Sequence, residues 1–222
     1  PDAVRQPSES VADVVEEVAR VYGYNRIELK MPMGDSTPPA RDHRVRNLRL
    51  ALRSHGFTEI LPLSLTGEKV LAKSGMNLND VVKIQNPLGE ELGILHPHTL
   101  PGLLEHAERN ILHSAEGLKT FHWGNVFHRD LPEHTELTAL LVPPRNAQTE
   151  LRTSPLLHLK GIVEECFAHI GAPLEVRTAG EPTAYTHPGR MGSIVLGNVT
   201  VGTIYEVHPT VLLAFDLPAR TA

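Results

Sequence analysis

The sequence contains a single cysteine, Cys166, among its 222 residues. One cysteine cannot build an internal disulfide framework, and this scarcity is typical of proteins from the reducing cytoplasm. No apolar run approaches the roughly 20 residues that cross a bilayer as a helix. The chain begins with proline, and no charged segment followed by an apolar one comes after it, so we expect its start to be cut from a longer chain. A cytoplasmic protein without a membrane span is therefore expected.

The sequence also lacks the short motifs of the commonest catalytic sites. Neither G-x-S-x-G, nor a Walker loop, nor G-x-G-x-x-G occurs. Cys166 falls on the apolar stripe of an expected helix, which favours a core position over a nucleophile. His96 and His98 lie close together, but no H-E-x-x-H or paired-cysteine pattern supplies the further ligands that zinc needs. We expect structural or surface roles for most of the histidines and predict no catalytic residue in this chain.

Arginine is concentrated around one expected helix, near residues 42–56. The net charge of −5 at pH 7 argues against bulk, unspecific nucleic-acid binding by the whole chain. A local cluster of arginines is able to face phosphate or an acidic protein surface, or it is simply solvated. The candidates for partner binding are Arg41, Arg44, Arg46, Arg49 and Arg53.

A second charged helix is expected at residues 11–22, with Ser10 as its N-cap. Its acidic residues Asp13, Glu16 and Glu17 share one face, because they are three and four residues apart. Magnesium binds through one or two carboxylates and water, so this face is a candidate metal site. Acidic residues also favour the first turn of a helix because of its dipole. The pattern alone is compatible with a metal site and with a solvated face.

The remaining elements favour an α+β fold. Strands are expected as neighbours and in hairpins, without regular βαβ alternation, which indicates an antiparallel sheet with helices packed on it. Residues 31–40 are rich in proline and glycine and mark the best domain boundary. The expected elements are helices at 42–56, 100–114 and 155–170, a strand at 57–65 with Phe57, Leu61, Leu63 and Leu65 on one face, and a hairpin turning at Gly197-Asn198.

The stretch HPGR, residues 187–190, joins turn-forming residues to a cation. Arg190 is able to anchor a carboxylate or phosphate, and it is equally able to tie a hairpin to a loop.

Eight segments, taken together and in order, resemble the β subunit of phenylalanyl-tRNA synthetase. Each is weak alone, but their order and spacing match that family over nearly the whole chain. The first is DVVEEVARVYGYNRI, and the eight are residues 13–27, 48–65, 84–95, 100–110, 121–127, 159–171, 187–190 and 201–209.

The resemblance implies a domain organisation and a fold. Residues 1–30 would be the C-terminal end of the small domain that precedes the synthetase core. Residues 38–222 would be a catalytic-like but non-catalytic class II synthetase core, which in the family runs further. That core is an antiparallel sheet flanked by helices, and residues 42–65 resemble the dimer-forming motif of the class.

The resemblance also implies a function and partners. The family joins phenylalanine to its tRNA with ATP and magnesium, and the active site lies in the α subunit. This chain would then scaffold the αβ assembly, with the α subunit and tRNA(Phe) as partners in an (αβ)2 heterotetramer. The arginine-bearing helix would serve that assembly. The alternative is a non-catalytic, synthetase-like module that binds RNA or another protein.

The resemblance sharpens the interpretation of the acidic helix. In the family, magnesium is held by an Asp followed by an Asp, Glu, Glu group. Asp13, Glu16 and Glu17 match the last three, whereas Pro7 stands where the first Asp is expected. Asp2 is the candidate for that first ligand, displaced by an apparent insertion.

Overall fold

The chain forms two compact units, Pro1–Arg41 and Asp42–Ala222. The computed structural model describes residues 11–31, 34, 41–145, 154–178 and 180–222. The first unit contains α1 (Val11–Tyr22), followed by a 3-10 helix, Tyr24–Arg26. Helix α1 lies where the sequence predicts it, whereas the expected N-cap Ser10 falls outside the described residues. No side chain of α1 is buried.

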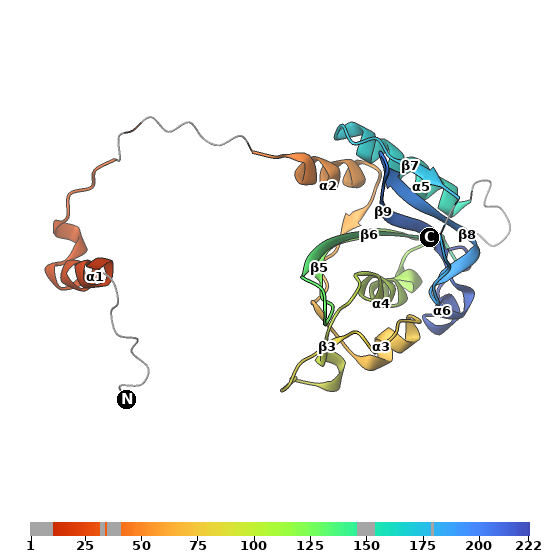
Figure 1. Cartoon of the computed structure of the whole chain (residues 1–222), viewed down its shortest axis with the longest axis horizontal. Coiled ribbons are helices and arrows are strands. Elements are labelled where there is room, and N and C mark those ends of the chain that lie inside the picture. The colour runs from red at the N-terminus through yellow and green to blue at the C-terminus, as the bar shows by residue number, and fades with distance from the viewer. Residues whose placement is uncertain (1–10, 32–33, 35–40, 146–153, 179) are drawn as a thin grey trace. The chain divides into compact units, whose positions relative to one another are not determined.

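The second unit contains three small sheets and the helices that cover them (Figure 1). The first sheet has the order β1-β5-β6, the second β2-β4-β3 and the third β7-β8-β9. The strands are β1 (Thr58–Glu59), β2 (Leu65–Thr66), β3 (Val82–Lys83), β4 (Ile94–Leu95), β5 (Leu118–Val126), β6 (His134–Val142), β7 (Glu175–Arg177), β8 (Thr186–Leu196) and β9 (Val199–Val207). The α-helices are α2 (Arg44–Ser54), α3 (Glu68–Lys73), α4 (Leu100–Asn110), α5 (Pro155–His169) and α6 (Pro209–Ala214), and 3-10 helices occur at Glu90–Leu92 and Ile111–His113.

Two long antiparallel pairs form the centre of this unit. Strands β5 and β6 pair without interruption, from Leu118 opposite Val142 to Val126 opposite His134. Strands β8 and β9 form the expected hairpin, and its turn at Gly197-Asn198 is confirmed. Gly197 adopts a φ of 62°, a left-handed conformation that glycine accepts without strain. The short strand β1 pairs with β5 in parallel, so the first sheet is mixed.

Helices cover both faces of these strands, and each face has its own hydrophobic core (Figure 1). On one face α2 and α5 pack over β5 and β9 through Leu52, Phe121 and Ile162. On the other face α4 and α6 pack over β6 and β9 through Leu104, Leu140 and other residues. The burial of two apolar sheet faces under helices is the main stabilising contribution to such a layered fold.

The prediction of a single long strand at residues 57–65 is wrong. Only Thr58–Glu59 and Leu65–Thr66 are strands, and they belong to different sheets. Leu61 and Leu63 are 81% and 67% exposed, although their alternation with Phe57 predicted a shared buried face. Pro62 lies between them and has no N–H to donate to a ladder, which ends β1 early.

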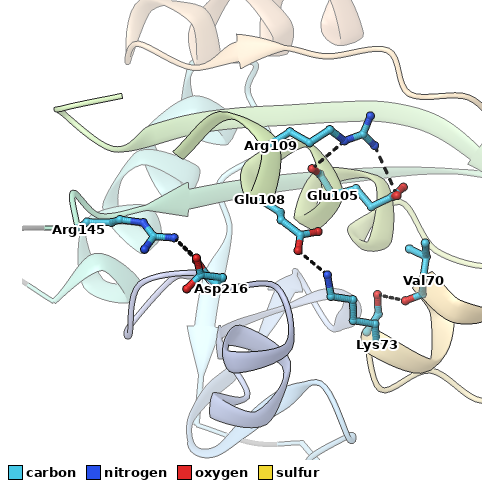
Figure 2. A network of polar contacts seen from close by, with 8 residues as sticks. Val70, Lys73, Glu105, Glu108, Arg109, Arg145 and Asp216 are labelled. Carbon is cyan, nitrogen blue, oxygen red and sulfur yellow. Dashed lines mark hydrogen bonds and ion pairs between the residues drawn. The ribbon is translucent and has the colours of Figure 1, made fainter. Parts of the chain in front are cut away.

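Polar contacts tie the ends of several elements together (Figure 2). The Lys73 ammonium of α3 lies 2.5 Å from a Glu108 carboxylate oxygen of α4 and 4.2 Å from the centre of the Phe215 ring. Arg145, just after β6, donates to the backbone and side-chain oxygens of Asp216, both at 2.6 Å. The latter contact holds the chain after α6 close to the end of β6. None of the described helices combines the length and apolar character that a membrane span requires.

Candidate functional site

Helix α2 is the element on which the sequence placed most of the partner-binding residues. Its inner face is set by Leu48 and Leu52, which are buried against α5 and the sheet. Val45 is 41% exposed. It lies in the first turn of the helix, ahead of the turns that contact the core.

Arg49 of α2 faces the protein rather than solvent. Its Nε lies 3.1 Å from a carboxylate oxygen of Glu59 on β1, and its guanidinium lies 5.7 Å from the ring centre of Trp123 on β5. The Nε–H does not point at the oxygen, so the contact with Glu59 is an ion pair without a hydrogen bond there. Arg49 therefore fastens α2 to two strands, which the sequence pattern did not indicate.

Arg44 is also engaged within the chain. Its guanidinium lies 2.6 Å from Asp42, and the same carboxylate accepts the Arg44 backbone N–H at 2.9 Å. These hydrogen bonds from Arg44 lower the pKa of Asp42 to about 2. Both side chains are exposed, so the pair orders the first turn of α2 without adding much stability.

The outward side of α2 combines apolar and basic residues. Arg46, Leu50 and Arg53 share one face by their i, i+4, i+7 spacing, and all three are exposed. Leu50 is 47% exposed. We refer to Val45, Arg46, Leu50 and Arg53 as the α2 surface. Arg41 is exposed as well, but it belongs to the first unit.

The acidic face of α1 carries the predicted metal ligands. Asp13, Glu16 and Glu17 are exposed, and the Glu17 carboxylate lies 2.6 Å from the Arg20 guanidinium. Among the residues that the structure describes, no group of three or more His, Cys, Asp or Glu side chains converges to hold a metal ion. Asp2 lies outside the described residues. The carboxylate oxygens of these residues are the donor type that suits magnesium.

A half-buried polar cluster that the sequence did not reveal centres on Glu136 of β6. Its Oε1 lies 2.8 Å from His98 Nδ1 and 2.9 Å from the backbone nitrogen of Thr99, and it also accepts the Thr99 hydroxyl. Burial alone would raise the pKa of Glu136, but hydrogen bonds from His98 and Thr99 outweigh it and lower the pKa to about 2. The Leu100 backbone nitrogen also lies 3.0 Å from His98 Nδ1.

Two further histidines lie close to this cluster and bond backbone carbonyls. His96 Nε2 lies 2.7 Å from the carbonyl oxygen of Asn125, and His122 Nδ1 lies 3.0 Å from that of Ile60. Burial lowers the pKa of both imidazoles. Each ring therefore acts as a neutral structural donor that fixes a loop to a strand.

Arg190 anchors a carboxylate of its own hairpin. Its Nη1 lies 2.6 Å from Glu206, whose side chain is 1% exposed, and Arg220 approaches the other oxygen of Glu206 at 3.4 Å. The stretch HPGR is part of β8, at a register shift between Thr186 and Met191, rather than a free turn. Of the two possibilities for Arg190, the structure shows an anchored carboxylate, which lies on the neighbouring strand of the same hairpin and not in a loop.

Cys166 is buried in the core under α5, and burial raises the pKa of its thiol to about 11. A thiol with that pKa is protonated at neutral pH and a poor nucleophile.

Comparison with known proteins identifies the family. Residues 27–222 match the family model described as phenylalanyl tRNA synthetase beta chain CLM domain. The chain belongs to this family. It is 34% identical to the phenylalanine–tRNA ligase beta subunit of Moorella thermoacetica, over 94% of this chain and 28% of the relative. It is 33% identical to that of Carboxydothermus hydrogenoformans, over 92% of this chain and 27% of the relative. The chain thus spans little more than a quarter of these beta subunits.

Solved structures confirm the fold class. The pyrrolysyl-tRNA synthetase of Desulfitobacterium hafniense superposes with a TM-score of 0.64 at 15% identity, covering 81% of this chain and 63% of that one. The predicted α+β fold of the class II synthetase kind, with strands flanked by helices, is therefore confirmed.

Proposed function

We propose that this chain is the part of a phenylalanine–tRNA ligase beta subunit that scaffolds the assembly with the α subunit. The whole enzyme would attach phenylalanine to tRNA(Phe) with ATP in the cytoplasm, as an (αβ)2 heterotetramer. This chain would contribute no catalytic residue and would meet tRNA only through the assembled enzyme. Its membership of the phenylalanyl-tRNA synthetase beta chain family supports the proposal.

The observation that carries the scaffold role is the exposure of large aliphatic side chains on residues 42–65. Leu50 on α2 is 47% exposed, and Leu61 and Leu63 after β1 are 81% and 67% exposed. Large exposed apolar patches mark protein interaction sites, and these three side chains belong to the segment, residues 42–65, that resembles the dimer-forming motif of the class. Arg46 and Arg53 provide a basic rim that suits an acidic partner surface.

The experiment is size-exclusion chromatography with light scattering, on the whole beta subunit alone and mixed with its α subunit. We expect Leu50→Asp combined with Leu63→Asp to weaken the complex at least about tenfold, because two buried apolar contacts become charged. Leu88→Asp is the matched control, since Leu88 is 97% exposed and lies outside residues 42–65. Unchanged assembly of the double variant, or an equal loss in the control, would refute the assignment of this surface.

We also propose that Asp13, Glu16 and Glu17, with Asp2, bind magnesium. The support is the family pattern and the shared helix face. Isothermal titration of the whole subunit with magnesium, compared with Asp13→Asn plus Glu16→Gln, tests this. Equal heats for both proteins would contradict the metal site and show that the acidic face is a solvated surface. The same chromatography with and without magnesium shows whether assembly depends on the ion.

A further inference from the structure

Residues 60–64 connect β1 to β2 and carry two of the most exposed leucines of the second unit. Leu61 and Leu63 are 81% and 67% exposed, and Pro62 lies between them. Short connections outside strands are usually mobile, and ordering them costs conformational entropy. The structure nevertheless fixes this connection at three points, each supplied by another part of the unit. We refer to Leu61, Pro62 and Leu63 as the leucine ridge.

The first fixed point is Ile60, directly ahead of the ridge. Its N–H donates to the Phe121 carbonyl at 2.9 Å, which continues the pairing of β1 with β5. Its carbonyl oxygen accepts a hydrogen bond from His122 Nδ1 at 3.0 Å. Because His122 is only 5% exposed, little water competes for this bond. The imidazole therefore holds the backbone beyond the end of β1 at Glu59.

The second fixed point lies at the other end of the ridge. The Ser64 carbonyl accepts the backbone N–H of His96 at 3.0 Å. His96 is itself fixed, because its Nε2 donates to the Asn125 carbonyl of β5 at 2.7 Å. The rings of His96 and His122 meet edge to face, with their centres 6.1 Å apart. Two buried histidines on and beside the same strand therefore hold both ends of the ridge.

The middle of the ridge rests on the first turn of α4. A Cβ atom on Gly102 would lie 3.1 Å from Pro62 Cβ and 3.2 Å from Pro62 Cγ, closer than ordinary van der Waals contact. The φ of Gly102 is not in the left-handed region, so alanine would fit its backbone and favour the helix more. Glycine at this position therefore serves the close approach of the Pro62 ring.

We propose that His96 and His122, with Gly102 beneath Pro62, are positioning residues that hold the leucine ridge ready to bind the α subunit. This inference rests on the proposed function, in which the two leucines contact that subunit. A loop that is ordered before binding loses less conformational entropy on binding, so its affinity is higher. Both histidines are buried, so they act on a surface partner only through the ridge.

The first test is the dissociation constant of the whole beta subunit for the α subunit, measured by titration calorimetry. His122→Phe keeps a buried ring and removes the donor to the Ile60 carbonyl, and we expect it to raise the dissociation constant about tenfold. Thr120→Val is the matched control on β5, because the Thr120 hydroxyl has no hydrogen-bond partner among the described residues. This control should leave the constant unchanged.

Gly102→Ala is an independent variant that favours the helix and displaces Pro62 at the same time. We expect the dissociation constant to rise about threefold, although circular dichroism shows no loss of helix. Gly161→Ala on α5 is the control, since a Cβ there would meet no described atom within 4 Å. An unchanged constant for Gly102→Ala would overturn the role proposed for Gly102.

A double-mutant cycle separates positioning from a general loss of stability. In a Leu61→Ala, Leu63→Ala background the ridge has no large side chains to place, so His122→Phe should no longer change the dissociation constant. Its effect on urea unfolding should be the same in both backgrounds. A tenfold loss of affinity that persists without the leucines would overturn the proposal, as would unchanged affinity of His122→Phe alone. Undiminished binding by the leucine variant itself would refute the docking surface, and the proposal with it.

Discussion

At the scale of single residues, the clearest lesson comes from Glu136. The sequence shows His98 only as one of two neighbouring histidines, whereas the partner that it shares with Thr99 lies 37 residues beyond Thr99. The Thr99 side chain makes no cap bond to α4, because its hydroxyl donates to Glu136. Local patterns find caps and turns but cannot show such long-range contacts, so the sequence missed this cluster. The arginine positions were predicted, but the inward role of Arg49 was not.

The half-buried Glu136 carboxylate makes the stability of the protein depend on pH. Its pKa is about 2 when folded and has an ordinary value near 4.5 when unfolded, so its stabilising effect is complete above about pH 4.5 and is lost as the pH falls toward 2. We expect Glu136→Gln to lower the free energy of unfolding at pH 7 by about 3 kcal/mol, and the deficit to shrink at pH 3. Urea unfolding at both values measures this. Glu116→Gln, at an exposed position, should leave stability unchanged at both. A deficit independent of pH would contradict the assignment.

At the scale of elements, periodicity located the long helices and the β8-β9 hairpin but failed between residues 57 and 65. Helix α5 and the hairpin turn are confirmed because apolar spacing and turn residues are local signals. The stretch around Pro62 alternates like a strand, yet Leu61 and Leu63 are exposed. Alternation records which residues share a face and not whether that face is covered by the chain itself.

The attachment of α2 to the sheet should depend on one arginine. We expect Arg49→Ala to lower the free energy of unfolding by about 1 kcal/mol, because the ion pair with Glu59 and the contact over Trp123 are both lost. The fluorescence of Trp123, the one tryptophan in the sequence, should change at the same time. Arg46→Ala on the exposed side of α2 is the control and should change neither quantity. Equal effects of the two substitutions would show that Arg49 contributes no specific contact.

At the scale of the whole molecule, the sequence predicted the α+β class and the helix layers, but not that the central strands form separate sheets. The strand order and the gap between β6 and β9 depend on contacts between residues about 80 positions apart, such as Leu141 and Ala222. Nothing in the local composition of β6 or β9 indicates an unpaired edge. Thr221 and Ala222 make backbone hydrogen bonds to Val207 of β9 and to Leu141 of β6, and so link the third sheet to the first.

That link should be visible in the stability of the second unit. Deletion of Thr221 and Ala222 removes three backbone hydrogen bonds and two buried side chains, so we expect the free energy of unfolding to fall by about 3 kcal/mol. Ala222→Gly keeps the backbone bonds and should cost about 1 kcal/mol or less. Urea unfolding followed by circular dichroism compares the two. If both changes cost the same, the link acts through the methyl group of Ala222 and not through its backbone.

The position of Cys166 has a practical consequence. It is the sole thiol of the sequence, and it lies on the inner face of α5, in the core between this helix and the sheet. A thiol reagent can reach it only when α5 moves away from the sheet, because the sulfur is buried. The rate of modification therefore reports how often α5 opens locally. If this rate is measured with and without the α subunit or magnesium, it shows which of them stabilises the packing of α5 on the sheet.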